Sequence, residues 1–370
     1  MEYISTRNKT LKYNFKDIFL RGLAPDGGLF IPQQIKKYNN SEIEKLSKLN
    51  YVDLATEIIL NFCSSDFEKN KLKKLLERSY KNFTTQEVIN IKKFGDINLI
   101  ELYHGPTLAF KDIAMQVLGN MYDELNISSN KTVNILVATS GDTGSAAIAA
   151  LNDRKNINVF VLHPYNKISN IQRKIMTTVG SNNIYNIAIR GTFDDCQKHV
   201  KEMFSENKFR EKINMSGVNS INWARIVCQI VYYFYSYFKF KNKKINFAVP
   251  TGNFGDVFAG YMAKKMGLPI EKLIVATNEN DILERVINTG EYKPSKVKPS
   301  LSPSMDVQIS SNFERLLFYI LDEDDKKVSV FMNDLKLKGS FLLNKEQIAI
   351  IKKDFSAKKI NDKETIEIIK

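Results

Sequence analysis

Residues 133–151 read VNILVATSGDTGSAAIAAL. The first six residues, Val133 to Ala138, form a short apolar run of the kind that makes a buried strand. The segment Ser140-Gly-Asp-Thr-Gly-Ser145 follows at once, and the alanine-rich run after it favours a helix. The stretch therefore predicts a strand, a glycine-rich turn and a helix in direct succession.

The same succession recurs along the chain. Four further apolar runs are typical of buried strands, each followed by helical spacing: Asn158 to Leu162, Tyr185 to Ile189, Ile245 to Val249 and Leu273 to Ala276. Strands that alternate with helices predict an α/β fold, with a mostly parallel sheet covered by helices on both faces. Ligands of such sheets bind beyond the carboxyl ends of the strands, so the loops there are the candidates for chemistry. Residues 1–94 differ, with a turn at Ala24-Pro-Asp-Gly-Gly28 and helical stretches such as Tyr51 to Asn61.

Composition argues against several classes of protein. The 370 residues are 43% apolar and 26% charged, which suits a globular chain of two or three domains. No apolar run approaches the ~18 residues of a membrane-spanning helix, and the polar first residues do not resemble a secretory signal. The three cysteines lie far apart without a CxxC pair, which argues against disulfides and structural zinc. We therefore expect a cytoplasmic protein with no membrane partner and no metal.

The net charge of +13 does not by itself indicate a nucleic-acid partner. Of the 54 basic residues, 44 are lysines scattered along the chain. A nucleic-acid binder would be expected to use more arginine, whose planar fork pairs bidentately with phosphates and bases. We interpret the lysines as a solvated surface. A polyanion-binding face is the alternative, and it rests on the charge alone.

The loop His104-Gly-Pro-Thr-Leu-Ala-Phe-Lys-Asp112 carries a lysine in an unusual place. The residues from Phe110 to Leu125 have apolar side chains at a spacing near 3.6, which predicts a helix. Lys111 lies off that stripe in the first turn, where the helix end is positive and disfavours a charged amine. A neutral amine can form an imine with a carbonyl compound. The alternative is a surface lysine that tolerates the position.

A second glycine-rich loop, Pro250-Thr-Gly-Asn-Phe-Gly-Asp256, also follows a predicted strand and precedes a predicted helix. Its hydroxyl, amide and backbone N–H groups could together hold a phosphate. Neither this loop nor the one at 140–145 is a Walker A loop or a dinucleotide fingerprint, and each alone could be an ordinary tight turn. Together with Lys111, they predict a phosphorylated cofactor whose aldehyde meets that lysine.

These motifs resemble those of threonine synthases. The resemblance runs through HGPTLAFKD at 104–112, SGDTG at 140–144, NSINWARIVCQIVYYF at 219–234, PTGNFGDVFAGYMAKKMGLPI at 250–270 and SPSMDVQISSNFERLLF at 302–318. It begins with STR at 5–7 and GLAPDGGLFIP at 22–32, so it extends along the whole chain. It implies a fold-type-II pyridoxal-phosphate enzyme, similar to the tryptophan synthase β subunit, with three regions: an N-terminal domain at 1–94, a catalytic core at 95–322 and a C-terminal part at 323–370.

The resemblance also implies an activity. Threonine synthases convert O-phospho-L-homoserine and water to L-threonine and phosphate by γ-elimination and β-hydration, the last step of threonine biosynthesis. The cofactor would be pyridoxal 5′-phosphate, bonded covalently to Lys111. The resemblance implies that the cofactor phosphate is bound by Gly252, Asn253, Phe254, Gly255 and Asp256, and that Asp142 lies near the cofactor 3′-oxygen. It implies that Ser140 and Thr143 bind the substrate carboxylate. Asn222 and Arg225 would bind the leaving phosphate.

The sequence departs from the family at its end. Threonine synthases continue for several tens of residues through segments resembling DPHTA and TAHPAKF, and neither string occurs here. A residue from that region faces the pyridine nitrogen in fold-type-II enzymes, and its absence predicts exposed apolar surface. An incomplete cofactor-binding protein and a related phospho-amino-acid lyase are therefore the alternatives. A monomer or a homodimer with a small-molecule substrate is expected.

Overall fold

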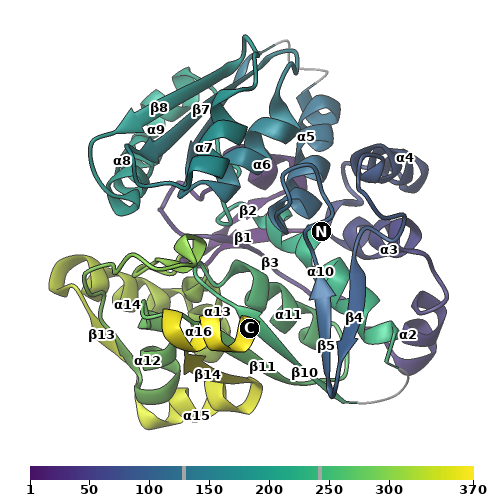
Figure 1. Cartoon of the computed structure of the whole chain (residues 1–370), viewed down its shortest axis with the longest axis vertical. Coiled ribbons are helices and arrows are strands. Elements are labelled where there is room, and N and C mark those ends of the chain that lie inside the picture. Colours follow the sequence, from purple (N-terminus) through teal and green to yellow (C-terminus); the bar gives the residue numbers. More distant parts are fainter. Residues whose placement is uncertain (127–130, 241–243) are drawn as a thin grey trace.

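The computed structural model describes residues 1–126, 131–240 and 244–370. It contains two lobes, each built on a parallel sheet, and an N-terminal part that packs against both (Figure 1). No helix among these residues combines the length and apolar character needed to cross a membrane.

The first lobe confirms the strand and helix predictions for residues 111–216, but the strand at 184–189, which was predicted to be buried, is largely exposed, with Tyr185 at 45% and Ile187 at 40%. Its sheet has the order β8-β7-β6-β9, and every neighbouring pair is parallel. The strands are β6 Val133–Ala138, β7 Ile157–Pro164, β8 Ile184–Ile189 and β9 Met215–Ser216. The helices are α5 Lys111–Asn126, α6 Asp142–Leu151, α7 Asn170–Thr177, α8 Phe193–Ser205 and α9 Asn207–Lys212. Strand β6 is the predicted run from Val133 to Ala138, and α6 starts four residues after it.

The second lobe holds the parallel sheet β10-β11-β14. Its strands are β10 Ile245–Pro250, β11 Ile270–Thr277 and β14 Phe355–Lys359, with a small antiparallel pair, β12 Glu291–Tyr292 and β13 Phe341–Leu342. Its helices are α11 Gly255–Lys265, α12 Ile282–Thr289, α13 Phe313–Ile320, α14 Asp325–Lys338, α15 Lys345–Asp354 and α16 Asp362–Ile369, with a 3₁₀ turn, η1 Pro303–Met305. The first two strands were predicted. Strand β14 was not, because its alternating FSAKK sequence carries two lysines.

The N-terminal part is more strand-rich than the sequence indicated. An antiparallel sheet β2-β1-β3 is formed by β1 Tyr3–Ser5, β2 Asn8–Tyr13 and β3 Phe30–Pro32. An antiparallel hairpin joins β4 Asn90–Phe94 to β5 Ile97–Glu101. The helices are α1 Phe15–Arg21, α2 Asn40–Leu46, α3 Tyr51–Cys63 and α4 Lys69–Tyr80. These strands were missed because several are short and others, such as β2, are polar and exposed.

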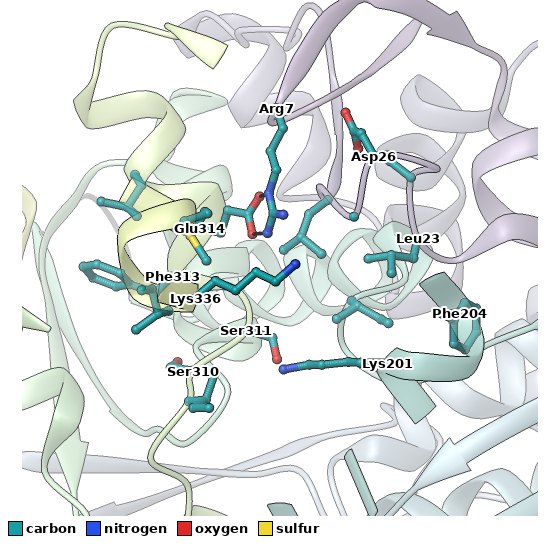
Figure 2. Close-up of a pocket in the computed structure, with 18 of the residues that line it drawn as sticks. Arg7, Leu23, Asp26, Lys201, Phe204, Ser310, Ser311, Phe313, Glu314 and Lys336 are labelled. Carbon is teal, nitrogen blue, oxygen red and sulfur yellow. Dashed lines mark hydrogen bonds and ion pairs between the residues drawn. The ribbon is translucent and has the colours of Figure 1, made fainter. Parts of the chain in front are cut away.

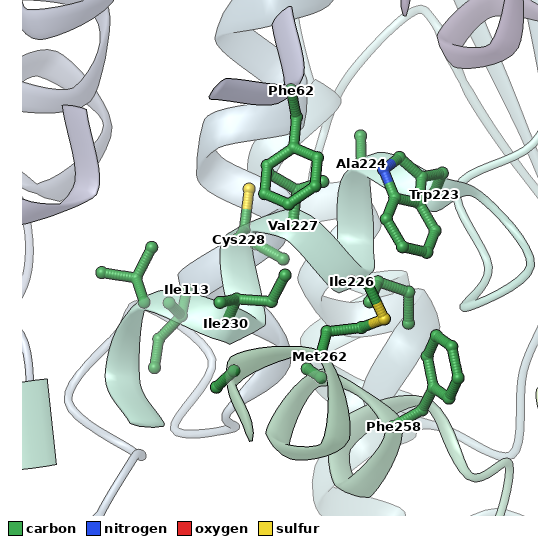
Figure 3. Packing of buried hydrophobic residues seen from close by; sticks show 14 of the residues in the cluster. Phe62, Ile113, Trp223, Ala224, Ile226, Val227, Cys228, Ile230, Phe258 and Met262 are labelled. Carbon is green, nitrogen blue, oxygen red and sulfur yellow. The ribbon is translucent and has the colours of Figure 1, made fainter. Parts of the chain in front are cut away.

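Helix α10, Trp223–Phe238, is the centre of the core. Its residues from Trp223 to Tyr237 are all buried, and it contacts α3, α5 and α11. Figure 3 shows the Trp223 ring among residues of these neighbours, and its centroid lies 6.0 Å from that of Phe62 and 6.4 Å from that of Phe258. The aromatic run that starts at Tyr232 is therefore core packing, and Cys228 is a buried free thiol within it.

Apolar side chains remain exposed at the edge of the second lobe. Leu337 on α14 is 81% exposed, and Ile368 and Ile369 on α16 are 75% and 79% exposed. The hairpin β4–β5 also exposes Ile97, at 70%.

Candidate functional site

Lys111 is the first residue of α5, as predicted from the apolar spacing. The apolar stripe of that helix is buried, and the Lys111 side chain points away from it and is only 12% exposed. Its ammonium group lies over the ring of Phe110, 4.6 Å from the centroid. The surface-lysine alternative does not fit this degree of burial.

Hydrogen bonds connect the loop before Lys111 to the start of α5. The Asp112 carboxylate accepts hydrogen bonds from the Thr107 N–H and hydroxyl, both at 2.7 Å. A Cβ at Gly105 would lie 2.4 Å from the Asp112 Cβ, so no larger residue fits there. The side chain of Asp112 is thus committed to the loop, and this closed turn fixes where α5 begins.

The Lys111 amine forms an ion pair with the Asp142 carboxylate. Asp142 is the first residue of α6, and its side chain is 11% exposed. The same carboxylate oxygen accepts a hydrogen bond of 2.6 Å from the Ser304 hydroxyl in η1, and the other accepts one of 2.6 Å from the Thr143 N–H. Burial alone would raise the pKa of Asp142, but the Lys111 charge and these hydrogen bonds together lower it below its ordinary value.

The loop between β6 and α6 depends on its two glycines. Gly141 has a φ of +135°, and a Cβ there would lie 2.2 Å from Gln172 Oε1. A Cβ at Gly144 would lie 2.6 Å from Thr139 Cγ2. The Thr139 hydroxyl accepts hydrogen bonds from the N–H groups of both glycines, at 2.9 and 2.8 Å. The loop is therefore rigid, and it holds Asp142 and the partly exposed residues Ser140 and Thr143 at the carboxyl end of β6.

The loop between β10 and α11 is shaped by close backbone contacts. Phe254 is left-handed, with a φ of 61°, and its side chain is fully buried. A Cβ at Gly252 would lie 3.0 Å from the Ser304 carbonyl oxygen, and one at Gly255 would lie 3.2 Å from Ser220 Cβ. Glycine at both positions thus lets η1 and the 219–222 segment approach the loop. The loop and the Lys111–Asp142 pair meet at Ser304.

Two neighbouring segments hold this second loop in place. The Asn312 amide donates to the Asn253 carbonyl oxygen at 3.0 Å, and the Ser310 hydroxyl donates to the Gly252 carbonyl oxygen at 2.9 Å. Asp256 accepts hydrogen bonds from the hydroxyls of Tyr232 and Tyr233 on α10. Burial raises the pKa of Asp256 in spite of these bonds.

Arg225 on α10 is buried, at 2% exposure. One end of its guanidinium donates to the Val218 carbonyl oxygen at 3.0 Å, while its Nε is buried with no hydrogen-bond partner in the described part of the chain. Burial lowers the pKa of Arg225, and the nearby carboxylates of Asp142 and Asp256 act against that effect. A buried cation with an unmet donor suits a site that receives an anion.

Asn222 is placed differently. It caps α10 by accepting from the Ala224 N–H at 3.1 Å, and its amide donates to the carbonyl oxygens of Phe19 and Gly217 at 3.0 and 2.9 Å. It has no exposed surface. Since every polar group of Asn222 is used inside the protein, these contacts give it a structural task, and we leave it out of the proposed site.

The residues present fit pyridoxal 5′-phosphate. Lys111 supplies the amine for its aldehyde, and the loop at 252–256 borders the same space through Ser304. The Asn253 side-chain oxygen is buried without a hydrogen-bond partner among the described residues, as is the Nε of Arg225. An unpaired guanidinium N–H suits an anion, and an unpaired amide oxygen suits a hydrogen-bond donor, so both atoms are compatible with a polar ligand that carries a phosphate.

Two residues of the site were not identified from the sequence. Ser304 lies 162 positions from Asp142, and only the fold brings them together. Ser220 lies beside Gly255 and accepts from the Asn312 amide at 3.1 Å. Both belong to the quoted motifs at 302–318 and 219–234, so the motifs marked the segments without indicating which side chains face the site.

Comparison with known proteins agrees with this arrangement. Residues 2–80 match the family model described as "Threonine synthase N terminus", and residues 96–335 match "Pyridoxal-phosphate dependent enzyme". The chain is 43% identical to a threonine synthase of Pseudomonas aeruginosa, covering 100% of this chain and 79% of that protein. It is 45% identical to a threonine synthase of Saccharomyces cerevisiae, covering 100% and 77%.

Solved structures show the same likeness. A PLP-bound threonine synthase from Brucella melitensis superposes with a TM-score of 0.92 at 43% identity, over 99% of this chain and 79% of that one. A threonine synthase structure from yeast superposes with a TM-score of 0.90 at 43% identity, over 99% and 77%.

Proposed function

This chain belongs to the threonine synthase family of pyridoxal-phosphate-dependent enzymes, and from that membership we propose what its own residues bind and do. The fold is that of a fold-type-II enzyme, the cofactor is pyridoxal 5′-phosphate, and the activity is that of a carbon–oxygen lyase. The proposal concerns the specific substrate and the task of each residue.

We propose that the substrate is O-phospho-L-homoserine, converted with water to L-threonine and phosphate. The observation that supports a phosphorylated substrate is Arg225, whose guanidinium is buried with its Nε unpaired. Removing such a cation from water is costly unless an anion meets it. A phosphate group bound there would pair with that charge in the substrate and again in the released product.

Pyridoxal phosphate, when bound, withdraws electrons from the carbons next to the amino group of the substrate. The protein's own part begins at Lys111. Its free Nζ amine would be a base beside the reacting carbons and could carry protons among them. Asp142 holds that amine in place through the ion pair, and Ser304 holds the Asp142 carboxylate.

The remaining residues orient the ligands. We propose that Gly252, Asn253, Phe254, Gly255 and Asp256 surround the cofactor phosphate, because their loop lies at the N-terminus of α11 where backbone N–H groups favour an anion. Ser140 and Thr143 are proposed for the substrate carboxylate. Their hydroxyls make no hydrogen bond within the part of the chain that the structure describes, and they flank the N-terminus of α6.

A substrate panel tests this proposal. The holoenzyme should release phosphate from O-phospho-L-homoserine at a rate at least about 100-fold above that from O-phospho-L-serine or O-phospho-L-threonine, since the site is shaped for one spacing of phosphate and amine. Arg225→Gln should raise KM for O-phospho-L-homoserine and leave cofactor absorbance in place. Release from O-phospho-L-serine alone would favour a related phospho-amino-acid lyase.

We propose that the protein works in a reducing compartment such as the cytoplasm, because Cys63, Cys196 and Cys228 are all buried free thiols. We further propose a monomer or a homodimer acting on a small molecule. Light scattering of the purified holoenzyme measures its oligomeric state.

A further inference from the structure

A cavity of about 400 Å³ lies where the N-terminal part, helix α8 and helices α13 and α14 come together. Neither Lys111 nor Asp142 lines it. Figure 2 shows Lys201 of α8 and Lys336 of α14 extending into it from different lobes, with the Lys201 amine directed toward the Ser311 hydroxyl. A volume of this size suits a small organic molecule.

The charges that line the cavity leave a surplus of one cation. Its charged residues are Arg7, Lys201, Lys336, Asp26 and Glu314, three cations and two carboxylates. Arg7 and Glu314 neutralise one another through two hydrogen bonds of 2.8 Å. Asp26 accepts from the Ser5 hydroxyl and the Gly28 N–H, both at 2.9 Å. The lysines, by contrast, have no carboxylate within 4.0 Å among the described residues.

Lys201 and Lys336 both line the cavity and both keep exposed surface. Neighbouring protein atoms desolvate the Lys201 amine and lower its pKa, while the carboxylates of Asp194 and Glu314 act to raise it and Arg7 to lower it. An anion that enters the cavity can therefore reach two ammonium groups without first opening the fold.

The rest of the wall is apolar. Leu23 and Leu29 contribute from the N-terminal part, Phe204 from α8, Phe313 and Leu317 from α13, and Met332 from α14. Figure 2 shows Leu23 and Phe204 on one side of the lysine pair and Phe313 on the other. A ligand that fills this space needs an apolar body as well as a charged head.

We propose that this cavity is a second ligand site, which binds a small amphipathic monocarboxylate with its head between Lys201, Lys336 and Ser311. The net charge of the lining favours one negative charge over two. The apolar wall favours an aromatic or aliphatic body of about ten carbon atoms in a space of this volume. The site is separate from the cofactor loops and does not depend on the proposed substrate.

Residues in and next to the cavity wall also form hydrogen bonds to the cofactor loop and to the segment beside it. Ser310, on its wall, donates to the Gly252 carbonyl oxygen at 2.9 Å. Arg315, next to the cavity residue Glu314, donates to the carbonyl oxygens of Ser220 and Ile221 at 3.2 and 2.7 Å. A ligand that orders these residues would act on the segments beside the phosphate loop, so its binding is expected to change KM for the substrate.

Calorimetric titration of the holoenzyme with 4-phenylbutyrate tests the site directly. The uncharged 4-phenylbutan-1-ol tests the need for the carboxylate, and acetate tests the need for the apolar body. We expect saturable binding of one 4-phenylbutyrate per chain, about tenfold tighter than the alcohol because of the charged hydrogen bonds. Acetate should bind about 100-fold more weakly because it buries little apolar surface.

Variants locate the binding. Lys201→Met and Lys336→Met should each weaken 4-phenylbutyrate about tenfold and leave the alcohol unchanged. Lys198→Met, on the same helix and 71% exposed, is the matched control and should change neither. The proposal is overturned if 4-phenylbutyrate does not saturate, if the alcohol binds equally well, or if both cavity variants bind 4-phenylbutyrate like the wild type. Thermal melting confirms that each variant is folded.

Discussion

The Lys111 amine and the Asp142 carboxylate form an ion pair that joins the loop before α5 to the loop before α6. The two residues are 31 positions apart, and each is the first residue of its helix. Helix starts favour anions and disfavour cations, so Asp142 is stabilised by its position and supplies the charge that offsets the unfavourable position of Lys111.

Loss of the Asp142 charge should reduce the stability of the protein most when the cofactor is absent. Asp142→Asn leaves the Lys111 ammonium without its partner, which should reduce the free energy of unfolding at pH 7 by roughly 3 kcal/mol. Because folding lowers the pKa of Asp142, its contribution is complete above the unfolded value of about 3.9 and is lost as pH falls through the folded value. Urea unfolding between pH 7 and pH 3 measures this.

The control is Asp153→Asn, an exposed aspartate two residues beyond the end of α6, whose hydrogen bond from the Ser181 hydroxyl an amide oxygen can also accept. It should change the free energy of unfolding by less than about 0.5 kcal/mol. The free energy of unfolding of the wild type should approach that of Asp142→Asn as pH falls. If the difference between them stays constant down to pH 3, the ion pair does not stabilise the protein in this way.

Ser304 is a positioning residue for Asp142. Ser304→Ala removes the 2.6 Å hydrogen bond and should lower kcat/KM about tenfold, as expected for a hydrogen bond to a charged group. Ser304→Thr keeps the hydroxyl and should restore most of the activity. Ser302→Ala is the control, since the Ser302 hydroxyl bonds Asn278 and not Asp142. Equal losses in both alanine variants would show that the loop, and not the hydrogen bond, matters.

Gly144 is required by packing and not by backbone conformation. Its added Cβ would lie 2.6 Å from Thr139 Cγ2 and 2.7 Å from Met176 Sδ. Gly144→Ala should therefore destabilise the protein by about 2 kcal/mol, although alanine favours helices. Gly180→Ala, where nothing lies within 4 Å of the new Cβ, should be nearly neutral. Denaturant unfolding compares the two, and a neutral Gly144→Ala would contradict the geometry of the loop.

Glu101, at the end of the β4–β5 hairpin, gives an independent pH test. Its carboxylate accepts from Lys92 at 2.7 Å and from the Tyr103 hydroxyl at 2.6 Å, and these bonds lower the pKa of Glu101 to about 2. The stabilisation is present above the ordinary value near 4.5 and disappears as pH falls toward 2. The urea midpoint of Glu101→Gln should approach that of the wild type over this window. Glu87→Gln, an exposed glutamate, should show no such convergence.

The sequence was sufficient to predict the part of the fold in which strands alternate with helices. Strand β6 and the helices α5, α6 and α11 were located closely because their apolar patterns are regular and the glycine loops mark their ends. The hairpin β4–β5 and strand β14 were missed, since their side chains are largely polar or exposed and their pairing is decided by distant segments.

The site residues likewise include some that the sequence predicted and others that only the fold brings together. Lys111 was found from its place at a helix start, and the resemblance to threonine synthases added Asp142. Ser304 could not be found from local pattern, because it reaches Asp142 from the other lobe. Asn222 stood in the same motif as Arg225, yet the fold uses it as a helix cap, which no spacing argument could separate from ligand binding.

We expect this chain to make L-threonine at a site built on Lys111. The most direct measurement is the release of L-threonine and phosphate from O-phospho-L-homoserine by the holoenzyme, with Lys111→Ala assayed in parallel. We expect equal amounts of the two products from the wild type, and from Lys111→Ala a rate at least about 1,000-fold lower, with the absorbance of lysine-bound cofactor lost. Phosphate release without L-threonine would rule out this reaction, and full activity in Lys111→Ala would rule out Lys111 as the cofactor lysine.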